Sequence, residues 1–310
     1  NRMEFINQNR NYVEDVMAKN RLDALIVPID SHGAASDGEN YAIAYSDITT
    51  GEFKITELEG LKDFKTEFAK IAPAEVICEE GFLPKLKPWQ LSGHFFPYNY
   101  SGESEKDLKN HFGVASLSGF GLDGKILAAN ASAMLLQYLK ETQKSNLEHI
   151  NGISFYKSSA FMPIDESLIR NLELFYTNRD GKKEGSLIWV LDQTVSPMGG
   201  RMLRKWLLHP LLDKTEIEKR LNGVEVFVKN SSLLREVRAV LEKIYDIERL
   251  LGRLSLGTGN ARDLVAMKQS LQMIPELMNL IKNYFSELFK GMDPLKDLCE
   301  LIEKAIREES

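Results

Sequence analysis

Residues 41–55, with the sequence YAIAYSDITTGEFKI, decide the fold of the first half of the chain. Large side chains alternate with small ones over residues 41–46, which is typical of a β-strand. Thr49, Thr50 and Gly51 then form a turn signal before a second alternating run. The pattern predicts a β-hairpin. Because its small positions are also apolar, we expect a sheet that is covered on both faces.

The segments around this hairpin predict an α/β or α+β domain over residues 1–150. Apolar residues fall at helical spacing over residues 61–71 and 125–143, and the short apolar runs at 75–78 and 112–117 are typical of buried strands. The order of hairpin, helix, strand and helix is that of a mixed domain. We also expect a helix over residues 5–19, a loop over residues 31–40, and breaks at Pro28 and Pro73.

From about residue 151 the pattern changes to one helix after another, which predicts an all-α domain over residues 151–310. A length of 310 residues, at roughly 150 per domain, also suits two domains. Capping signals mark the expected helix starts. These signals are Thr215 with Glu218, Ser231 or Ser232, Asn260, and Asp293 before Pro294, with an interruption expected at Pro275 and a last helix that ends near Glu308.

The charge of the chain is unevenly distributed. The net charge is −6: the first 150 residues, with 15 basic and 22 acidic side chains, carry −7, and residues 151–310 carry +1. This balance argues against nucleic-acid binding by bulk electrostatics, so any DNA contact is expected to be local and in the second half. An acidic first half instead suits a basic partner surface.

The rest of the composition indicates an intracellular protein without a metal centre. Cys78 and Cys299 are far apart, and the five His residues lack the spacing of metal ligands. No apolar run approaches the roughly 18 residues that span a bilayer. We therefore expect a reducing, cytoplasmic location. Because the sequence begins at Asn1 without a signal peptide, we expect it to be a piece of a longer protein.

Residues 119–125, with the sequence GFGLDGK, nearly match a phosphate-binding loop. Such a loop wraps phosphates with backbone N–H groups, and a hydroxyl after its Lys holds magnesium. Ile126 follows Lys125 here and has no hydroxyl. We therefore interpret the stretch as a glycine-rich turn that leads into a helix, and we assign no cofactor-binding residue to it.

Asp47 and Glu79 both stand at the ends of predicted strands. RNase H-type nucleases place two magnesium-binding carboxylates in this way, with a strand-end Asp in a hairpin and an acid after the first helix. The further acids that such a site needs are not evident, since Asp107 and Asp123 are loop candidates alone. Asp and Thr at a hairpin tip are more often turn formers. A magnesium-dependent nuclease that uses Asp47 and Glu79 is the alternative hypothesis for the function.

Arg201, Arg204 and Lys205 share one helix with His209, and they form the one site that we single out for contact with phosphate or an acidic partner domain. The alternative is that these residues form an ordinary solvent-exposed face of the helix. Phe285 and Glu287 resemble a base-stacking Phe-x-Glu motif, but the neighbouring apolar spacing predicts that Phe285 belongs to a helix core. No catalytic residue and no metal ligand can be assigned.

Three stretches together resemble the MutS family of DNA mismatch-repair proteins. They are residues 169–174 (IRNLEL), residues 191–213 (LDQTVSPMGGRMLRKWLLHPLLD), and residues 246–264, which begin DIERL and end NARDL. In this order they are specific to the core, or lever, domain of the family. Residues 47–53 (DITTGEF) and 120–122 (FGL) are similar to its connector domain.

The resemblance implies an RNase H-like connector domain over residues 1–150, preceded by a linker helix, and the first half of the helical core domain over residues 151–310. It implies no enzymatic activity or cofactor for this piece. The parent protein would be a homodimeric, DNA-dependent ATPase that uses ATP and magnesium and binds mismatched DNA. The piece would transmit conformational change between the DNA clamp and the ATPase, and its connector would dock a MutL-type protein. A stand-alone helical adaptor remains a third hypothesis.

Overall fold

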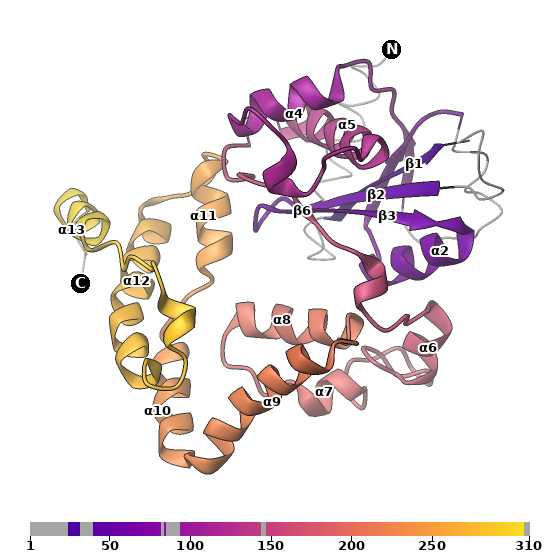
Figure 1. Cartoon of the computed structure of the whole chain (residues 1–310). Coiled ribbons are helices and arrows are strands. Elements are labelled where there is room, and N and C mark those ends of the chain that lie inside the picture. Colours follow the sequence, from indigo (N-terminus) through magenta and orange to yellow (C-terminus); the bar gives the residue numbers. More distant parts are fainter. Residues whose placement is uncertain (1–23, 32–39, 82–83, 85–93, 144–146, 307–310) are drawn as a thin grey trace. The chain divides into compact units, whose positions relative to one another are not determined.

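The computed structural model describes residues 24–31, 40–81, 84, 94–143 and 147–306. The chain divides into two compact units (Figure 1). The first, here called the sheet unit, comprises Asn1–Ser159 with Pro163–Leu168, and the second, the helical unit, comprises Ala160–Met162 with Ile169–Ser310. The helix expected over residues 5–19 and most of the loop expected over residues 31–40 lie outside the described residues.

A six-stranded sheet forms the centre of the sheet unit, in the order β5-β4-β1-β2-β3-β6. Neighbouring pairs β1–β2 and β2–β3 are antiparallel, and the other three pairs are parallel. The predicted hairpin is confirmed as β2 and β3, with Asp47 opposite Glu52 at its tip. The strands are β1 (Ala24–Ser31), β2 (Asn40–Asp47), β3 (Glu52–Glu59), β4 (Glu75–Cys78), β5 (His94–Pro97) and β6 (Ser154–Phe155).

Helices cover both faces of this sheet, as its two-sided apolar pattern predicts. Helix α2 (Gly60–Ile71) places Phe64 and Phe68 against Tyr41 and Ile43 of β2. The alternate residues of β2 point to the opposite face, where α5 (Ile126–Gln143) packs against β1, β2 and β3 (Figure 1). Ala42 and Ala44 are completely buried there. Small side chains on that face therefore leave room for the helix.

Two expectations for the sheet unit are wrong. Residues 112–117 are not a strand, because helix α4 (Ser104–Phe112) extends to Phe112 and ends at Gly113, whose φ of 64° is left-handed. The chain also does not break at Pro28, which lies inside β1 opposite Ile43. Within the described residues, β4 pairs with β1 only at Leu25 and Ile26. The missing N–H of Pro28 therefore costs no hydrogen bond on that side of β1.

The helical unit consists of helices of 5 to 21 residues, and its described part contains two apolar clusters. Leu250, Met267, Leu271 and Cys299 form the first, and Leu233, Val237 and Ile281 form the second. None of the helices in the described part of the chain combines the length and apolar composition that a membrane crossing needs. The helices from α6 onward are α6 (Glu166–Asn171), α7 (Leu187–Leu191), α8 (Pro197–Leu208), α9 (Lys214–Lys229), α10 (Ser231–Leu241), α11 (Ile247–Ser255), α12 (Ala261–Ile281) and α13 (Lys296–Ala305).

The caps of these helices correct the sequence prediction in several places. Asn260 does cap α12, and it forms a capping box with Asp263. However, Asp213 rather than Thr215 caps α9, and Asn230 rather than Ser231 or Ser232 caps α10. Both side chains accept a hydrogen bond from the third residue of the helix, which is the ordinary N-cap geometry.

Two predictions based on prolines in the helical unit are also wrong. Helix α12 continues through Pro275, because residues on both sides of the proline are held by packing: Leu271 in the first cluster and Ile281 in the second. Helix α13 begins at Lys296 and not at Pro294. Asp293 instead accepts a hydrogen bond from the N–H of Leu295, which forms a turn before the helix. The expected end near Glu308 lies outside the described residues.

Candidate functional site

Arg201, the first of the predicted basic residues on α8, holds two helices together. Its guanidinium donates two hydrogen bonds, of 2.6 and 2.7 Å, to the two carboxylate oxygens of Asp246, and it also contacts Glu248 at 2.5 Å. Asp246 is the N-cap of α11, where it accepts a bond from the N–H of Arg249. Arg201 therefore joins α8 to the start of α11, and it is committed to these two acids.

The charges of this pair stabilise each other. Burial alone would raise the pKa of Asp246, but the hydrogen bonds and positive charge of Arg201 outweigh it and hold that pKa below its usual value. Conversely, the hydrogen bonds that Arg201 donates to Asp246 raise the pKa of Arg201. Both side chains are only partly exposed, so solvent screens the pair less than it screens a surface ion pair.

Arg204 has a different environment from Arg201. Its guanidinium carbon lies 3.8 Å from the centre of the Phe175 ring, which is a cation–π contact with a buried aromatic side chain. Burial lowers its pKa. Within the described residues, no carboxylate forms an ion pair with Arg204. Its hydrogen-bonding capacity is thus less committed than that of Arg201.

Lys205 and His209 complete the predicted basic group. Lys205 is exposed, and its backbone carbonyl lies 3.2 Å from Nδ1 of His209 at the end of α8. The centroids of the His209 and Phe161 rings lie 5.2 Å apart, in a T-shaped arrangement. The four residues are therefore not one uniform basic face. The contact of Arg201, Arg204 and Lys205 with phosphate or a partner domain stays a prediction.

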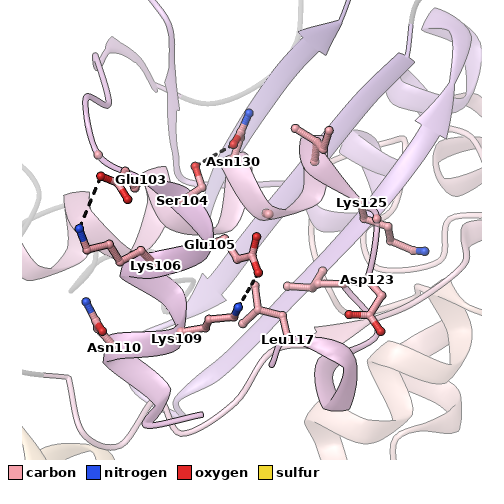
Figure 2. Close-up of a pocket in the computed structure, with 15 residues that line it drawn as sticks. Glu103, Ser104, Glu105, Lys106, Lys109, Asn110, Leu117, Asp123, Lys125 and Asn130 are labelled. Carbon is pink, nitrogen blue, oxygen red and sulfur yellow. Dashed lines mark hydrogen bonds and ion pairs between the residues drawn. The ribbon is translucent and has the colours of Figure 1, made fainter. Parts of the chain in front are cut away.

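The near phosphate-binding loop forms one wall of an open cavity of about 750 Å³ between α4 and the start of α5 (Figure 2). Gly121 and Gly124 have φ values of 74° and 69°, as a glycine-rich turn requires. The N–H of Ala128, in the first turn of α5, donates to a carboxylate oxygen of Glu57 at 3.1 Å. A carboxylate of the chain itself thus caps the helix terminus that a phosphate would use.

Lys125 lines this cavity, but its amine lies against an aromatic ring. Its amine lies 4.8 Å from the centre of the Phe155 ring, and Figure 2 shows it pointing away from Glu105 and Lys109. The interpretation of residues 119–125 as a turn before a helix is consistent with these contacts.

The cavity between α4 and α5 is lined by charges of both signs. Lys106 contacts Glu103 at 3.5 Å, and Lys109 contacts Glu105 at 2.5 Å, while Asp123 lies on the opposite wall (Figure 2). The Ser104 hydroxyl donates to Asn130 of α5 at 2.7 Å, which links the two helices. Such a wide polar cavity is better suited to bind the surface of another protein than to bind an apolar small molecule.

Asp47 forms the turn between β2 and β3. One of its carboxylate oxygens accepts bonds from the N–H and the hydroxyl of Thr49, at 2.9 and 2.6 Å, and from the N–H of Thr50 at 3.3 Å. Glu79 is exposed after β4. Within the described ranges, no three His, Cys, Asp or Glu side chains are grouped as ligands for a metal ion. The geometry does not favour the nuclease hypothesis.

Phe285 is half-buried and packs against an apolar cluster, as expected, but it does not lie within a helix. Helix α12 ends at Ile281, and Phe285 precedes a short 3₁₀ helix, Ser286–Phe289. Its ring stacks on Phe227 with centroids 5.6 Å apart. Packing explains this Phe without any role in stacking on bases.

Sequence reasoning missed a buried polar network in the sheet unit. The hydroxyl of Tyr156, next to β6, donates to Glu67 of α2 at 2.7 Å, and Lys70 lies 3.3 Å from the other oxygen of that carboxylate. Glu67 and Lys70 are almost completely buried. The sequence contains one sign that Glu67 is buried, because this residue falls between Phe64 and Phe68 on the apolar face of its helix. Its partner Tyr156 is 89 residues away and could not be inferred.

Comparison with known proteins identifies two consecutive domains of one family. Residues 24–151 match the model of MutS domain II, and residues 168–310 match that of MutS domain III. The fold and these matches define a mixed α/β domain followed by a helical domain of a DNA mismatch-repair protein. The chain belongs to the MutS family, and the predicted resemblance is confirmed. The predicted boundary after residue 150 stays a prediction.

Curated relatives agree with these matches. The chain is 42% identical over 288 residues to the DNA mismatch repair protein MutS of Halothermothrix orenii, which covers 87% of this chain and 32% of that protein. It is 38% identical over 285 residues to the protein of the same name from Caldanaerobacter subterraneus, with coverage of 87% and 33%. The chain thus spans about a third of the length of these relatives.

Proposed function

We propose that this chain is the connector domain and the first half of the core domain of a protein that binds mismatched DNA in an ATP-dependent manner. The observation that carries the proposal is the order of the two MutS domains, together with relatives that are named as mismatch-repair proteins. The parent would be a homodimeric ATPase that uses magnesium and works in the cytoplasm. This piece would supply neither the catalytic site nor the mismatch reader.

Within that protein, the helical unit would transmit conformational change. Helix α12 is 21 residues long, which corresponds to roughly 30 Å. Its first half packs in one apolar cluster and its end in the other. A helix that packs in two separate clusters can carry a displacement from one to the other, which supports a coupling role.

The connection of α8 to α11 through Arg201 provides the test of this coupling. In the full-length protein, Asp246→Asn should leave mismatch affinity in the absence of nucleotide close to that of wild type, and it should reduce the change in affinity that ATP causes. The control is Lys219→Ala, which removes an exposed ion pair on α9. Unchanged ATP dependence in a stably folded Asp246→Asn protein would argue against the role of this connection.

The sheet unit would have the RNase H-like topology of the connector. An antiparallel three-stranded meander, with β4 and β5 added in parallel beside β1, supports this assignment. We further propose that this acidic unit docks a MutL-type protein, and the polar cavity between α4 and α5 is a suitable surface. The charge of −7 over residues 1–150 supports a basic partner surface.

Binding of the chain to the matching MutL-type protein tests the docking proposal. We expect affinity that falls as ionic strength rises, since the attraction between opposite charges is screened. The charge reversal Glu105→Lys should weaken binding, whereas Glu59→Lys, at an exposed strand end away from the cavity lining, should not. Salt-independent binding, or equal effects of the two variants, would contradict the proposal.

A further inference from the structure

The sequence contains the dipeptide Asn-Gly twice, at Asn151–Gly152 and at Asn222–Gly223. An asparagine side chain in this dipeptide can react with the backbone nitrogen that follows it, because glycine has no Cβ to hinder the attack and few limits on its conformation. The two copies lie in different structures. Asn222 and Gly223 are inside helix α9, whereas Asn151 and Gly152 lie in irregular backbone just before β6. The fold therefore provides a matched comparison of the same dipeptide in two environments.

Helix α9 restrains the reaction at Asn222. Each interior N–H of an α-helix donates to the carbonyl four residues earlier, so the nitrogen of Gly223 already has a partner. The helical dihedral angles also keep this nitrogen away from the side chain of Asn222. Attack therefore requires local unfolding in the middle of a 16-residue helix.

Asn151 has a much less restrained environment. Its side chain is exposed, and within the part of the chain that the structure describes, neither this side chain nor the N–H of Gly152 forms a hydrogen bond. Asn151 lines a cavity of about 500 Å³ together with His111 and Glu148. Water thus has access to the amide, and the nitrogen of Gly152 can approach it without breaking a hydrogen bond.

We infer that Asn151 is a site of spontaneous deamidation, in which the chain modifies itself with water as the co-reactant. The nitrogen of Gly152 loses its proton and attacks Cγ of Asn151. The new N–Cγ bond closes a cyclic succinimide, and the side-chain nitrogen leaves as ammonia. Water then opens the ring at either carbonyl, which gives aspartate or isoaspartate, and no atom is oxidised or reduced. This inference concerns the chemistry of the chain itself and does not depend on the proposed activity toward DNA.

Isoaspartate at position 151 strains the segment that leads out of the sheet. It adds one carbon to the backbone between two fixed points. At the first, Nε2 of His111 lies 3.1 Å from the carbonyl oxygen of Ile150, and at the second, Phe155 of β6 pairs with Ile55 of β3. A longer backbone cannot keep both contacts at their present geometry. We therefore expect the isoaspartate form to be less stable than the unmodified chain.

Peptide mapping of the folded chain after incubation at mildly alkaline pH tests the inference. Trypsin places the two dipeptides in separate peptides, residues 145–157 and 221–229, and mass spectrometry reports the conversion of amide to acid in each. We expect amide loss at Asn151 to be faster than at Asn222 by roughly tenfold or more, since the helical copy reacts only through local opening. In urea, where both copies are unfolded, the two rates should be nearly equal. Equal rates in the folded chain would overturn the inference.

Gly152→Ala tests the route of the reaction. Gly152 does not have a left-handed φ, and an added Cβ would meet Phe120 at 3.5 Å, which is an ordinary contact, so the fold should tolerate the change. Amide loss at residue 151 should slow roughly tenfold, because the Cβ hinders the attacking nitrogen. Loss of the amide at an unchanged rate, or without any isoaspartate among the products, would exclude the succinimide and overturn the inference.

A stability measurement tests the effect of the modification. The isoaspartate form should melt several degrees below the unmodified chain. Asn151→Asp adds the same charge without the extra backbone carbon, so it should melt close to the unmodified chain. An isoaspartate form that melts with Asn151→Asp would contradict the strain at this segment. DNA binding is not measured in any of these experiments, so their outcome is separate from that of the proposed function.

Discussion

At the scale of single residues, the ion pair between Arg201 and Asp246 shows why a cluster of basic residues in a sequence is weak evidence for a binding site. The sequence places Arg201, Arg204 and Lys205 on one helix, and that placement is correct. It does not reveal that Asp246, 45 residues later, occupies the guanidinium of Arg201. A cation is available to a ligand only when its own chain does not already neutralise it.

The first prediction concerns the stability that this pair contributes. Asp246→Asn should destabilise the helical unit by about 1–3 kcal/mol near neutral pH, because it removes charge-assisted hydrogen bonds and leaves Arg201 without its main partner. Urea unfolding measures the change. Lys219→Ala, at an exposed pair, should cost less than about 0.5 kcal/mol. A loss no larger than this control would contradict the structural role.

The ion pair between Arg201 and Asp246 also predicts how the stability of the folded protein changes with pH. The pKa of Asp246 is lower in the folded protein than in the unfolded chain, so its contribution is fully present above the unfolded value, near 3.9. That contribution is lost as the pH falls through the lower folded value. The stability difference between wild type and Asp246→Asn should therefore shrink below about pH 4. A difference that grows in acid would contradict this sign.

A second residue-scale prediction separates the two interpretations of Asp47. If Asp47 is a turn former, Asp47→Ala should destabilise the sheet unit by about 1–2 kcal/mol. The substitution removes the carboxylate oxygen that accepts three hydrogen bonds in the turn. The chain should not cleave single-stranded, duplex or hybrid nucleic acid with magnesium or manganese. Cleavage that disappears in Asp47→Asn would restore the nuclease hypothesis.

At the scale of elements, the cap of α5 explains why a glycine-rich turn can resemble a phosphate-binding loop. A glycine-rich turn and a phosphate-binding loop are each followed by a helix, and the first N–H groups of that helix have no acceptor within the helix. Here Glu57, from β3, supplies the acceptor. The acceptor comes from a strand about 70 residues earlier, so the local motif contains no sign of it.

This cap leads to the third prediction. Glu57→Ala should destabilise the sheet unit by about 1 kcal/mol, since it leaves the N–H of Ala128 without its acceptor. Lys125→Ala should have a smaller effect, because its contact with Phe155 is a cation–π interaction near the surface. Thermal unfolding of the two variants checks the order. A larger effect for Lys125→Ala would show that the loop has a role that its contacts do not explain.

Local patterns predict an element well when its own residues decide its structure. The hairpin of β2 and β3, helix α2 and helix α5 follow from alternation, helical spacing and turn residues, and all three are found. Strand β6 is two residues long and exists through pairing with β3 about 100 residues earlier, so no local pattern could indicate it. Likewise, Pro275 looks like a helix end, but packing on both sides of it keeps α12 continuous.

At the scale of the whole molecule, the fourth prediction concerns what the 310-residue chain cannot do. It should neither hydrolyse ATP nor bind a mismatched duplex more tightly than a matched one at physiological salt. Residues 119–126 lack the magnesium-binding hydroxyl, and Phe285 is packed on Phe227 rather than free to enter a base step. ATPase assays and gel shifts with the two duplexes measure this. ATP hydrolysis by the chain that Lys125→Ala abolishes would contradict this prediction, because it would show that residues 119–126 act on ATP.

The two ends of the six-stranded sheet have a consequence for how the protein behaves at high concentration. Strand β5, at one edge, has four residues, and β6, at the other, has two. A strand at an edge exposes unpaired backbone groups that can recruit a strand from another molecule, and short edges offer little template for that process. Self-association through strand addition is thus disfavoured in the sheet unit. When the chain is concentrated, light scattering should not respond to substitutions in the edge strands.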